Sequence, residues 1–225
     1  MKSINKKLLA MAIAVAVSGE VAAYEVGDII VRAGYAAVDP RESSSAIKVD
    51  GDPAPLDGVN VGVNGNAQLG LTASYIFAPH WGVEVLAATP FKHDIYLNEA
   101  GLKLGSTKQL PPTVSAQYYI LEPNSAWQPY VGLGLNYTKF FSESVSNDAK
   151  SALGASDLHL KDSYGLAAEA GVDWLVDKNW VVNASVWRTQ IRSEASVKIN
   201  DGANKVTTKV TIDPWVYMVA VGYKF

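Results

Sequence analysis

The fold is decided most clearly by the C-terminal stretch, residues 215–225, which reads WVYMVAVGYKF. From Trp215 to Phe225 every second position holds a large apolar side chain, whereas Gly222 and Lys224 are among the residues between them. Successive side chains of a β-strand point to opposite faces, so a period of two is typical of a strand. This stretch therefore predicts a terminal strand with one continuous apolar face.

The same alternation recurs along the chain, and no helical period is seen after Tyr24. We predict seven further strands, at about residues 29–37, 67–77, 81–87, 113–120, 131–138, 164–174 and 182–186. Eight strands of about ten residues match the smallest usual outer-membrane barrel. The predicted fold is therefore all-β, an eight-stranded antiparallel up-and-down transmembrane β-barrel.

A soluble β-sandwich would also alternate, so connection lengths and aromatic residues have to distinguish the two folds. Short connections at 78–80, 122–126 and 176–179 alternate with long ones at 39–65, 90–110, 141–161 and 189–206. Outer-membrane barrels have short periplasmic turns and long extracellular loops. Aromatic residues beside the short connections would form a periplasmic girdle: Phe77, Trp81, Tyr118, Trp127, Trp174, Trp180, Tyr223 and Phe225. A second girdle is expected from Tyr35, Phe91, Tyr137, Tyr164, Trp215 and Tyr217. Both features favour the barrel.

The first residues have the pattern of a secretory signal peptide. Three lysines at positions 2, 6 and 7 are followed by an apolar segment at 8–17 and by a small-residue cleavage site, VAA, at 21–23. We therefore expect residues 1–23 to be a signal peptide and residues 24–225 to be the outer-membrane barrel. The apolar segment has about half of the roughly 20 residues that a transmembrane helix needs.

Charge and composition argue against several functions. Without residues 1–23 the chain has 16 basic and 21 acidic side chains, a net charge of −5, which disfavours nucleic acid as a partner. The sequence contains no Cys, and His80, His93 and His159 are scattered, so neither a metal site nor another cofactor is predicted. We find no nucleophile, base and orienting acid that would converge, and an enzyme is therefore not expected.

The inward-facing positions change in character along the barrel. Near the periplasmic end, charged side chains should pair and plug the lumen, because an isolated charge is costly inside a narrow barrel. The predicted lumen plug consists of Arg32, Glu84, Glu169 and Asp173. Toward the extracellular loops the inward positions are apolar and predict a substrate funnel: Val38, Leu86, Ala88, Phe140, Trp187, Val216 and Met218. An apolar mouth above a polar plug suits a small hydrophobic ligand better than an ion or a sugar.

Prolines flank the long connection between the third and fourth predicted strands. Pro90 ends the third strand, and Pro111 and Pro112 begin the fourth. Because proline cannot donate a ladder hydrogen bond, these neighbouring strands should pair weakly near the outer leaflet. The three prolines are therefore candidates for a lateral gate through which a ligand leaves the barrel. The residues alone are equally consistent with prolines that only end two strands at a loop.

Several segments resemble the outer membrane protein W (OmpW) family. They are AATPFKH at 87–93, LPPT at 110–113 and QPYVGLG at 128–134, together with VRAG at 31–34 and the aromatic C-terminus. The resemblance covers essentially the whole chain after residue 23, although 39–65 and 141–161 match no family motif. It implies an eight-stranded barrel with a narrow hydrophobic interior that passes small hydrophobic molecules sideways into the membrane. This expectation favours the lateral gate.

Two further expectations concern partners. Lys139, Arg188 and Lys209 face outward near the loop end, where they would contact the phosphates of lipopolysaccharide among the outer-membrane lipids. Phe225 is the terminal aromatic residue that many outer-membrane barrels present to the assembly machinery as a signal. 

Taken as a function, these features predict a channel in the bacterial outer membrane for passive uptake of small hydrophobic molecules, with lateral exit between strands three and four. The alternative is a structural or adhesive barrel that only displays its loops. A purely structural barrel should be filled with polar networks to the top of its lumen, so the apolar upper lumen favours transport.

Overall fold

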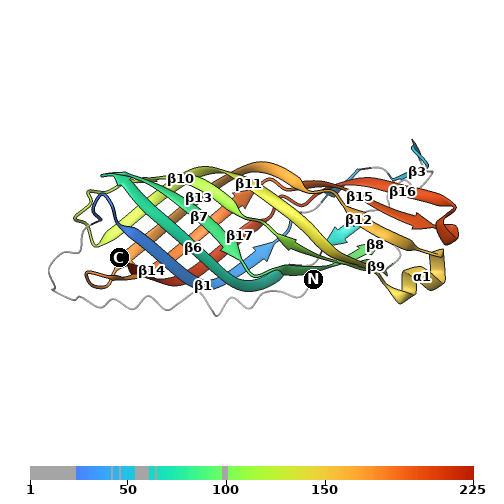
Figure 1. Ribbon diagram of the computed structural model, residues 1–225, viewed down its shortest axis with the longest axis horizontal. Helices are drawn as coiled ribbons and strands as arrows, with labels where there is room; N and C mark the ends of the chain where they lie inside the picture. The colour runs from blue at the N-terminus through green and yellow to red at the C-terminus, as the bar shows by residue number, and fades with distance from the viewer. Residues whose placement is uncertain (1–23, 42, 46, 54–60, 64, 98–100) are drawn as a thin grey trace.

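The computed structural model describes residues 24–225 except 42, 46, 54–60, 64 and 98–100. The predicted signal peptide, residues 1–23, lies outside the described residues and stays a prediction. Figure 1 shows a barrel of tilted strands at the left that continues along the same axis into a second β-structure at the right. The C-terminus lies at the end of the barrel that has the short turns.

Eight strands form the barrel, and each pairs antiparallel with its two neighbours. They are β1 (Ile29–Asp39), β6 (Asn66–Ala78), β7 (Trp81–Ala88), β10 (Thr113–Tyr119), β11 (Trp127–Val145), β13 (Ser163–Leu175), β14 (Trp180–Thr189) and β17 (Trp215–Lys224). The order around the wall is β10, β7, β6, β1, β17, β14, β13 and β11, and the pairing of β11 with β10 closes it. First and last strands pair from Ile30 opposite Lys224 to Asp39 opposite Trp215. The predicted eight-stranded up-and-down barrel is thus confirmed.

The alternation of the strands separates an outer from an inner face. Along β17, Met218 and Ala220 are buried in the lumen, whereas Tyr217 and Val219 between them are exposed on the outside. The outer face is apolar around the wall, and Leu133 on β11 is 74% exposed. Such a surface would be unfavourable in water and is the surface that a transmembrane barrel presents to lipid.

Aromatic side chains encircle the short-turn end of the barrel wall, as predicted. Neighbouring strands bring them into contact in pairs, with centroids 5.0 Å apart for Trp81 and Tyr118, and 5.6 Å apart for Trp127 and Trp174. In the second girdle one assignment is wrong. Phe91 is buried inside the structure, because the strand is interrupted just before it and its side chain turns inward.

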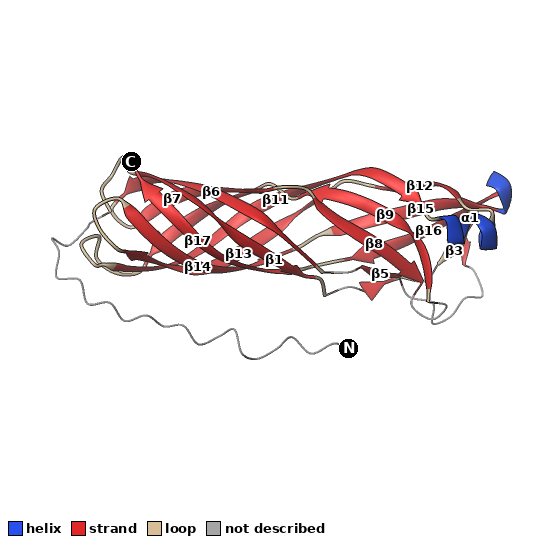
Figure 2. Ribbon diagram, turned by 90° about the horizontal axis from the view of Figure 1, so that it is seen from below, coloured by secondary structure: helices blue, strands red, loops and turns tan. Residues whose placement is uncertain are grey.

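The long connections are not plain loops, contrary to the prediction, because most of their described residues form strands that extend the barrel (Figure 2). The elements are β2 (Ser43–Ser44), β3 (Lys48–Val49), β4 (Asp52–Pro53), β5 (Val61–Val63), β8 (Phe91–Leu97), β9 (Leu102–Leu110), α1 (Asn147–Leu153), β12 (Ser156–Leu160), β15 (Arg192–Ile199), the 3₁₀ turn Asn200–Gly202 and β16 (Asn204–Thr211). We call this part the extension. In the extension the apolar side chains face inward and the polar ones outward, the reverse of the barrel wall: Val210 is buried and Lys209 is exposed. An outer face of this kind is suited to water rather than to lipid.

The interior is layered along the barrel axis. An apolar and aromatic cluster fills the short-turn end: Tyr24, Ile30, Ile76, Tyr119, Tyr130, Leu175 and Val181. A second cluster lies higher in the barrel and contains Ala36, Leu86, Trp187, Met218 and Ala220. A third fills the extension around Ile95, Phe140, Leu160, Ile191, Val210 and Ile212. Within the described part of the chain, no helix has the length and apolar character needed to cross a membrane.

Candidate functional site

A polar layer crosses the lumen between the first two clusters, and Arg32 lies at its centre. Its guanidinium is 1% exposed and contacts two carboxylates: Nη1 lies 3.0 Å from Oε2 of Glu84 on β7, and Nη2 pairs with Oδ2 of Asp173 on β13. Nε of Arg32 donates a further bond of 3.0 Å to Oδ1 of Asp173. Three of the four predicted plug residues therefore join three strands across the lumen.

Glu169, the fourth predicted plug residue, lies in the same part of the lumen, but the ion pairs of Arg32 within the described residues are with Glu84 and Asp173. Its Oε1 accepts a bond of 2.5 Å from Ser115 Oγ on β10. Oε1 of Glu84 and Oε2 of Glu169 are buried without a hydrogen-bond partner among the described residues. The layer thus holds three buried carboxyl groups and one guanidinium, which pairs with two of them.

Contrary to the prediction, the polar layer does not form the bottom of the lumen. Beneath it lies the apolar and aromatic cluster, in which Tyr24 and Tyr119 contact edge to face with centroids 5.3 Å apart. The hydroxyl of Tyr24 donates a 2.7 Å bond to Oδ2 of Asp173. Residue 24 was considered only as the start of the barrel segment, whereas the inward positions of Tyr119 and Tyr130 could have indicated this layer.

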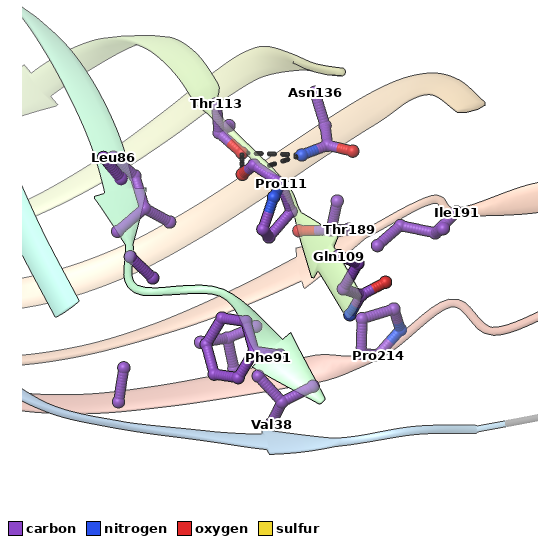
Figure 3. A pocket seen from close by; sticks show the side chains of 14 residues that line it. Val38, Leu86, Phe91, Gln109, Pro111, Thr113, Asn136, Thr189, Ile191 and Pro214 are labelled. Atoms are coloured by element: carbon purple, nitrogen blue, oxygen red, sulfur yellow. Dashed lines mark hydrogen bonds between the residues drawn. The ribbon is translucent and has the colours of Figure 1, made fainter. Parts of the chain in front are cut away.

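An apolar cavity lies above the second cluster, and we call it the barrel cavity (Figure 3). It is narrow, with a free volume of about 30 Å³. Four of the predicted funnel residues line it: Val38, Leu86, Ala88 and Val216. Trp187 and Met218 are buried in the second cluster, where they pack with Leu86. Several other lining residues were not predicted from the sequence, among them Phe91, Gln109, Asn136, Ile191 and Pro214.

Phe140, the remaining predicted funnel residue, lines a second cavity farther from the short-turn end, which we call the extension cavity. Its free volume is about 20 Å³, and its walls are residues of β8, β9, β11, β12, β15 and β16 together with Ile212. Gln109 lines both cavities. The predicted single funnel is therefore two apolar spaces with one polar side chain between them.

The wall of the barrel cavity has an interruption at the predicted lateral gate. The ladder between β7 and β10 runs up to Leu86 opposite Thr113, and pairing resumes at Phe91 opposite Gln109, between β8 and β9. Residues 87–90 and 110–112, all of them described, lie between these two pairs and have no pairing with each other. We call this interruption the wall gap. It contains Pro90, Pro111 and Pro112, and three of its residues, Ala87, Ala88 and Pro111, line the barrel cavity.

Each of these segments keeps its bonds on its other side. The amide of Thr89 donates to the carbonyl of Leu69 on β6, and the carbonyl of Pro112 accepts from Tyr137 on β11. The two segments therefore remain hydrogen-bonded to β6 and β11, and the wall gap affects only the pairing between the segments that carry the prolines.

The predicted lipid-contact residues lie at different heights. Lys139 is exposed on β11, opposite Leu110, and the guanidinium of Arg188 lies 5.4 Å from the ring centre of Trp215. Lys209 is exposed on β16 in the extension, opposite Glu194. Close to Lys139, the pKa of Asp162 is lowered because its carboxylate accepts bonds from the hydroxyl of Tyr137 and the amide of Phe140.

The terminal residue Phe225 is 70% exposed, and the centre of its ring lies 4.8 Å from that of Tyr223.

A closed eight-stranded barrel with an apolar outer face, an aromatic girdle and short turns at one end defines a bacterial outer-membrane protein. Comparison with known proteins gives the particular family: the chain belongs to the outer membrane protein W (OmpW) family, whose model matches residues 25–225. Its place is thus the bacterial outer membrane, and it is a non-enzymatic barrel. The resemblance, the location and the absence of enzymatic function expected from the sequence are confirmed.

Relatives of this family align with nearly the whole length of the chain. The chain is 48% identical over 212 residues to outer membrane protein W of Vibrio cholerae, covering 92% of this chain and 93% of that protein. It is 42% identical over 222 residues to outer membrane protein W of Escherichia coli, covering 98% and 100%. The crystal structure of OprG from Pseudomonas aeruginosa matches with a TM-score of 0.84 and 46% identity, over 90% of this chain and 98% of that one.

Proposed function

We propose that the protein is a channel for passive uptake of small hydrophobic molecules, which enter from the extracellular end and leave sideways into the outer membrane. One observation carries the proposal: the wall gap lies beside an apolar cavity, so the strand pairing of the wall is interrupted next to an apolar space.

The layers of the lumen support a lateral rather than an axial exit. Below the barrel cavity the second cluster, the polar layer and the aromatic cluster follow one another to the periplasmic end. An apolar molecule that moved through the polar layer would have to separate the ion pairs of Arg32, whereas the wall gap lies in the barrel wall beside the cavity. The route we propose is the extension cavity, Gln109, the barrel cavity and the wall gap.

The prolines provide the first test. In the variant with Pro90→Val, Pro111→Val and Pro112→Val, each new residue can donate a ladder hydrogen bond, and β-branched side chains favour strands. We expect the wall gap to close and uptake of radiolabelled octane by cells that make the protein to fall several-fold, toward that of cells without it. Uptake should be compared at equal amounts of folded barrel, measured by the different gel mobility of heated and unheated samples.

A matched control is Pro129→Val on β11, where the strand is paired with Val172 on β13 and accepts a bond from Ile120 on the other side. This change should leave octane uptake as it is. Octane uptake that is the same in the triple variant and in the original protein would refute the lateral gate. A barrel that gives no uptake above cells without the protein would instead favour the structural or adhesive function.

We also propose that Lys139, Arg188 and Lys209 bind the phosphates of lipopolysaccharide. Support comes from their positions, on or above the upper rim of an apolar outer wall. A Lys or Arg near an anionic lipid surface contributes about 1 kcal/mol, or roughly fivefold in affinity. Replacing all three by Gln should therefore weaken binding of lipopolysaccharide to the purified barrel by more than tenfold, whereas Lys150→Gln on α1 should have no effect. Unchanged binding and unchanged stability of the triple variant would contradict this proposal.

The assembly role of Phe225 remains part of the proposal. Its ring is exposed at the periplasmic end, and its backbone amide donates a 2.9 Å bond to the carbonyl of Ile29. An exposed terminal side chain on a bonded backbone is compatible with recognition by assembly machinery before the first and last strands pair.

A further inference from the structure

The polar side chain between the two apolar cavities is Gln109, on β9. It is 1% exposed and lines the barrel cavity (Figure 3) as well as the extension cavity. A buried amide in an apolar passage is costly unless its polar atoms are bonded. The partners of the polar atoms of Gln109 therefore decide whether its burial on the proposed route is unfavourable.

One end of the amide is held by a neighbour on β8. Nε2 of Gln109 lies 3.0 Å from Nε2 of His93, which is itself buried, and the His93 ring stacks on Phe91 with centroids 6.4 Å apart. The amide nitrogen donates and the ring nitrogen accepts. The carbonyl oxygen, Oε1, is buried without a hydrogen-bond partner among the residues that the structure describes.

Two other polar side chains of the barrel cavity, Asn136 and Thr113, already bond to each other. Nδ2 of Asn136 donates a 2.9 Å bond to Oγ1 of Thr113 and longer ones to the carbonyls of Pro111 and Pro112. Oδ1 of Asn136 accepts a 2.7 Å bond from Thr138. These groups support the wall beside the gap, whereas Gln109 keeps one unpaired atom at the junction of the two cavities.

We propose that Gln109 recognises a hydroxyl group, so that the molecules carried best are small apolar compounds with a single hydroxyl, such as alkanols and alkylphenols, rather than pure hydrocarbons. The inference rests on the proposed uptake function and names its substrate class. Oε1 accepts the hydroxyl proton while the hydrocarbon part lies in the apolar cavities. If the amide turns over, its NH₂ group donates to the hydroxyl oxygen instead, so a hydroxyl fits either orientation.

The test measures uptake of ³H-labelled 1-octanol and ¹⁴C-labelled octane from one mixture by the same cells, corrected for cells without the protein. The two probes share their chain length, and the ratio of their uptake does not depend on how much barrel is made. A site with a buried hydrogen-bonding group discriminates against an analogue that lacks the bonding partner. We expect the original protein to favour octanol by roughly five- to tenfold, the effect of one net hydrogen bond.

The variant Gln109→Leu keeps the size of the side chain and removes the amide. We expect its octanol to octane ratio to fall to about one, with octane uptake maintained or raised, because the unpaired polar atom has been removed from the passage. The matched control is Gln117→Leu on β10, an equally buried glutamine in the lower lumen, away from both cavities. Its ratio should equal that of the original protein.

The outcomes separate the two levels of the proposal. If octane enters through the original protein and octanol has no advantage, or if Gln109→Leu keeps the advantage, hydroxyl recognition is refuted and uptake of hydrophobic molecules stands. If neither probe enters the original protein above the level of cells without it, the uptake function fails and the inference fails with it.

Discussion

Joining Ala88 and Pro111 by a disulfide, in the variant Ala88→Cys with Pro111→Cys, is expected to reduce octane uptake to that of cells without the protein. Continuing the register upward from Leu86 opposite Thr113 brings these two positions face to face across the wall gap, and both line the barrel cavity. A covalent bond there would hold together the two strands that the ladder leaves apart. The chain has no Cys of its own, so the pair can form only this bond.

Reduction supplies the reverse experiment in the same sample. Addition of a membrane-permeant thiol should restore uptake within the time of reduction, which a permanent folding defect would not permit. The matched control is Val85→Cys with Val114→Cys, two outward-facing residues that lie opposite each other in the intact ladder below the gap. That disulfide should leave octane uptake unchanged with and without reductant. Full uptake by the oxidised Ala88 and Pro111 variant, with the disulfide verified by mass spectrometry, would contradict lateral exit.

The second large effect concerns stability. Replacing Arg32 by Met should lower the free energy of unfolding by about 3–5 kcal/mol, because it leaves the carboxylates of Glu84 and Asp173 buried without their cation. Ser74 also loses its 2.6 Å bond from the guanidinium. Urea unfolding of the barrel in lipid vesicles, followed by tryptophan fluorescence, would measure the change.

Two further variants show whether charge is the cause. Arg192→Met makes the same substitution at an exposed position of the extension and should change stability by less than about 0.5 kcal/mol. Adding Glu84→Gln and Asp173→Asn to Arg32→Met should recover much of the loss, since removing a whole buried network is far less costly than removing one member. Equal stability of the single and the triple variants would show that packing around Arg32, and not the unpaired charge, dominates.

The barrel strands could be predicted because lipid and lumen impose a local rule on every second residue. Leu133 and Val219 face outward for the same reason that Met218 faces inward, and no knowledge of distant residues is needed to see this. The inward position of the buried charges Arg32, Glu84 and Asp173 could be predicted from the same rule, since they alternate with apolar residues that face outward.

The extension was misread as loops because its rule is inverted. On β16 the apolar Val210 points inward and Lys209 outward, which is the pattern of a sheet in water. Strands were predicted only where every second residue is apolar and could face lipid, so the predicted strands end before the extension begins. Phe91 was assigned to the outer girdle for a related reason, since the interruption at residues 89–90 shifts which positions point into the interior.

The sequence by itself determined the number of barrel strands, their inner and outer faces and which charged residues point into the lumen, because alternation depends only on neighbours two positions apart. The tertiary structure alone decided that Phe91 and Gln109 meet Val38 and Pro214 at one cavity, and that residues 87–90 have no paired partner in 110–112. These features depend on the register between strands that are distant along the chain, and that register is set only when all the pairs of the closed barrel form together.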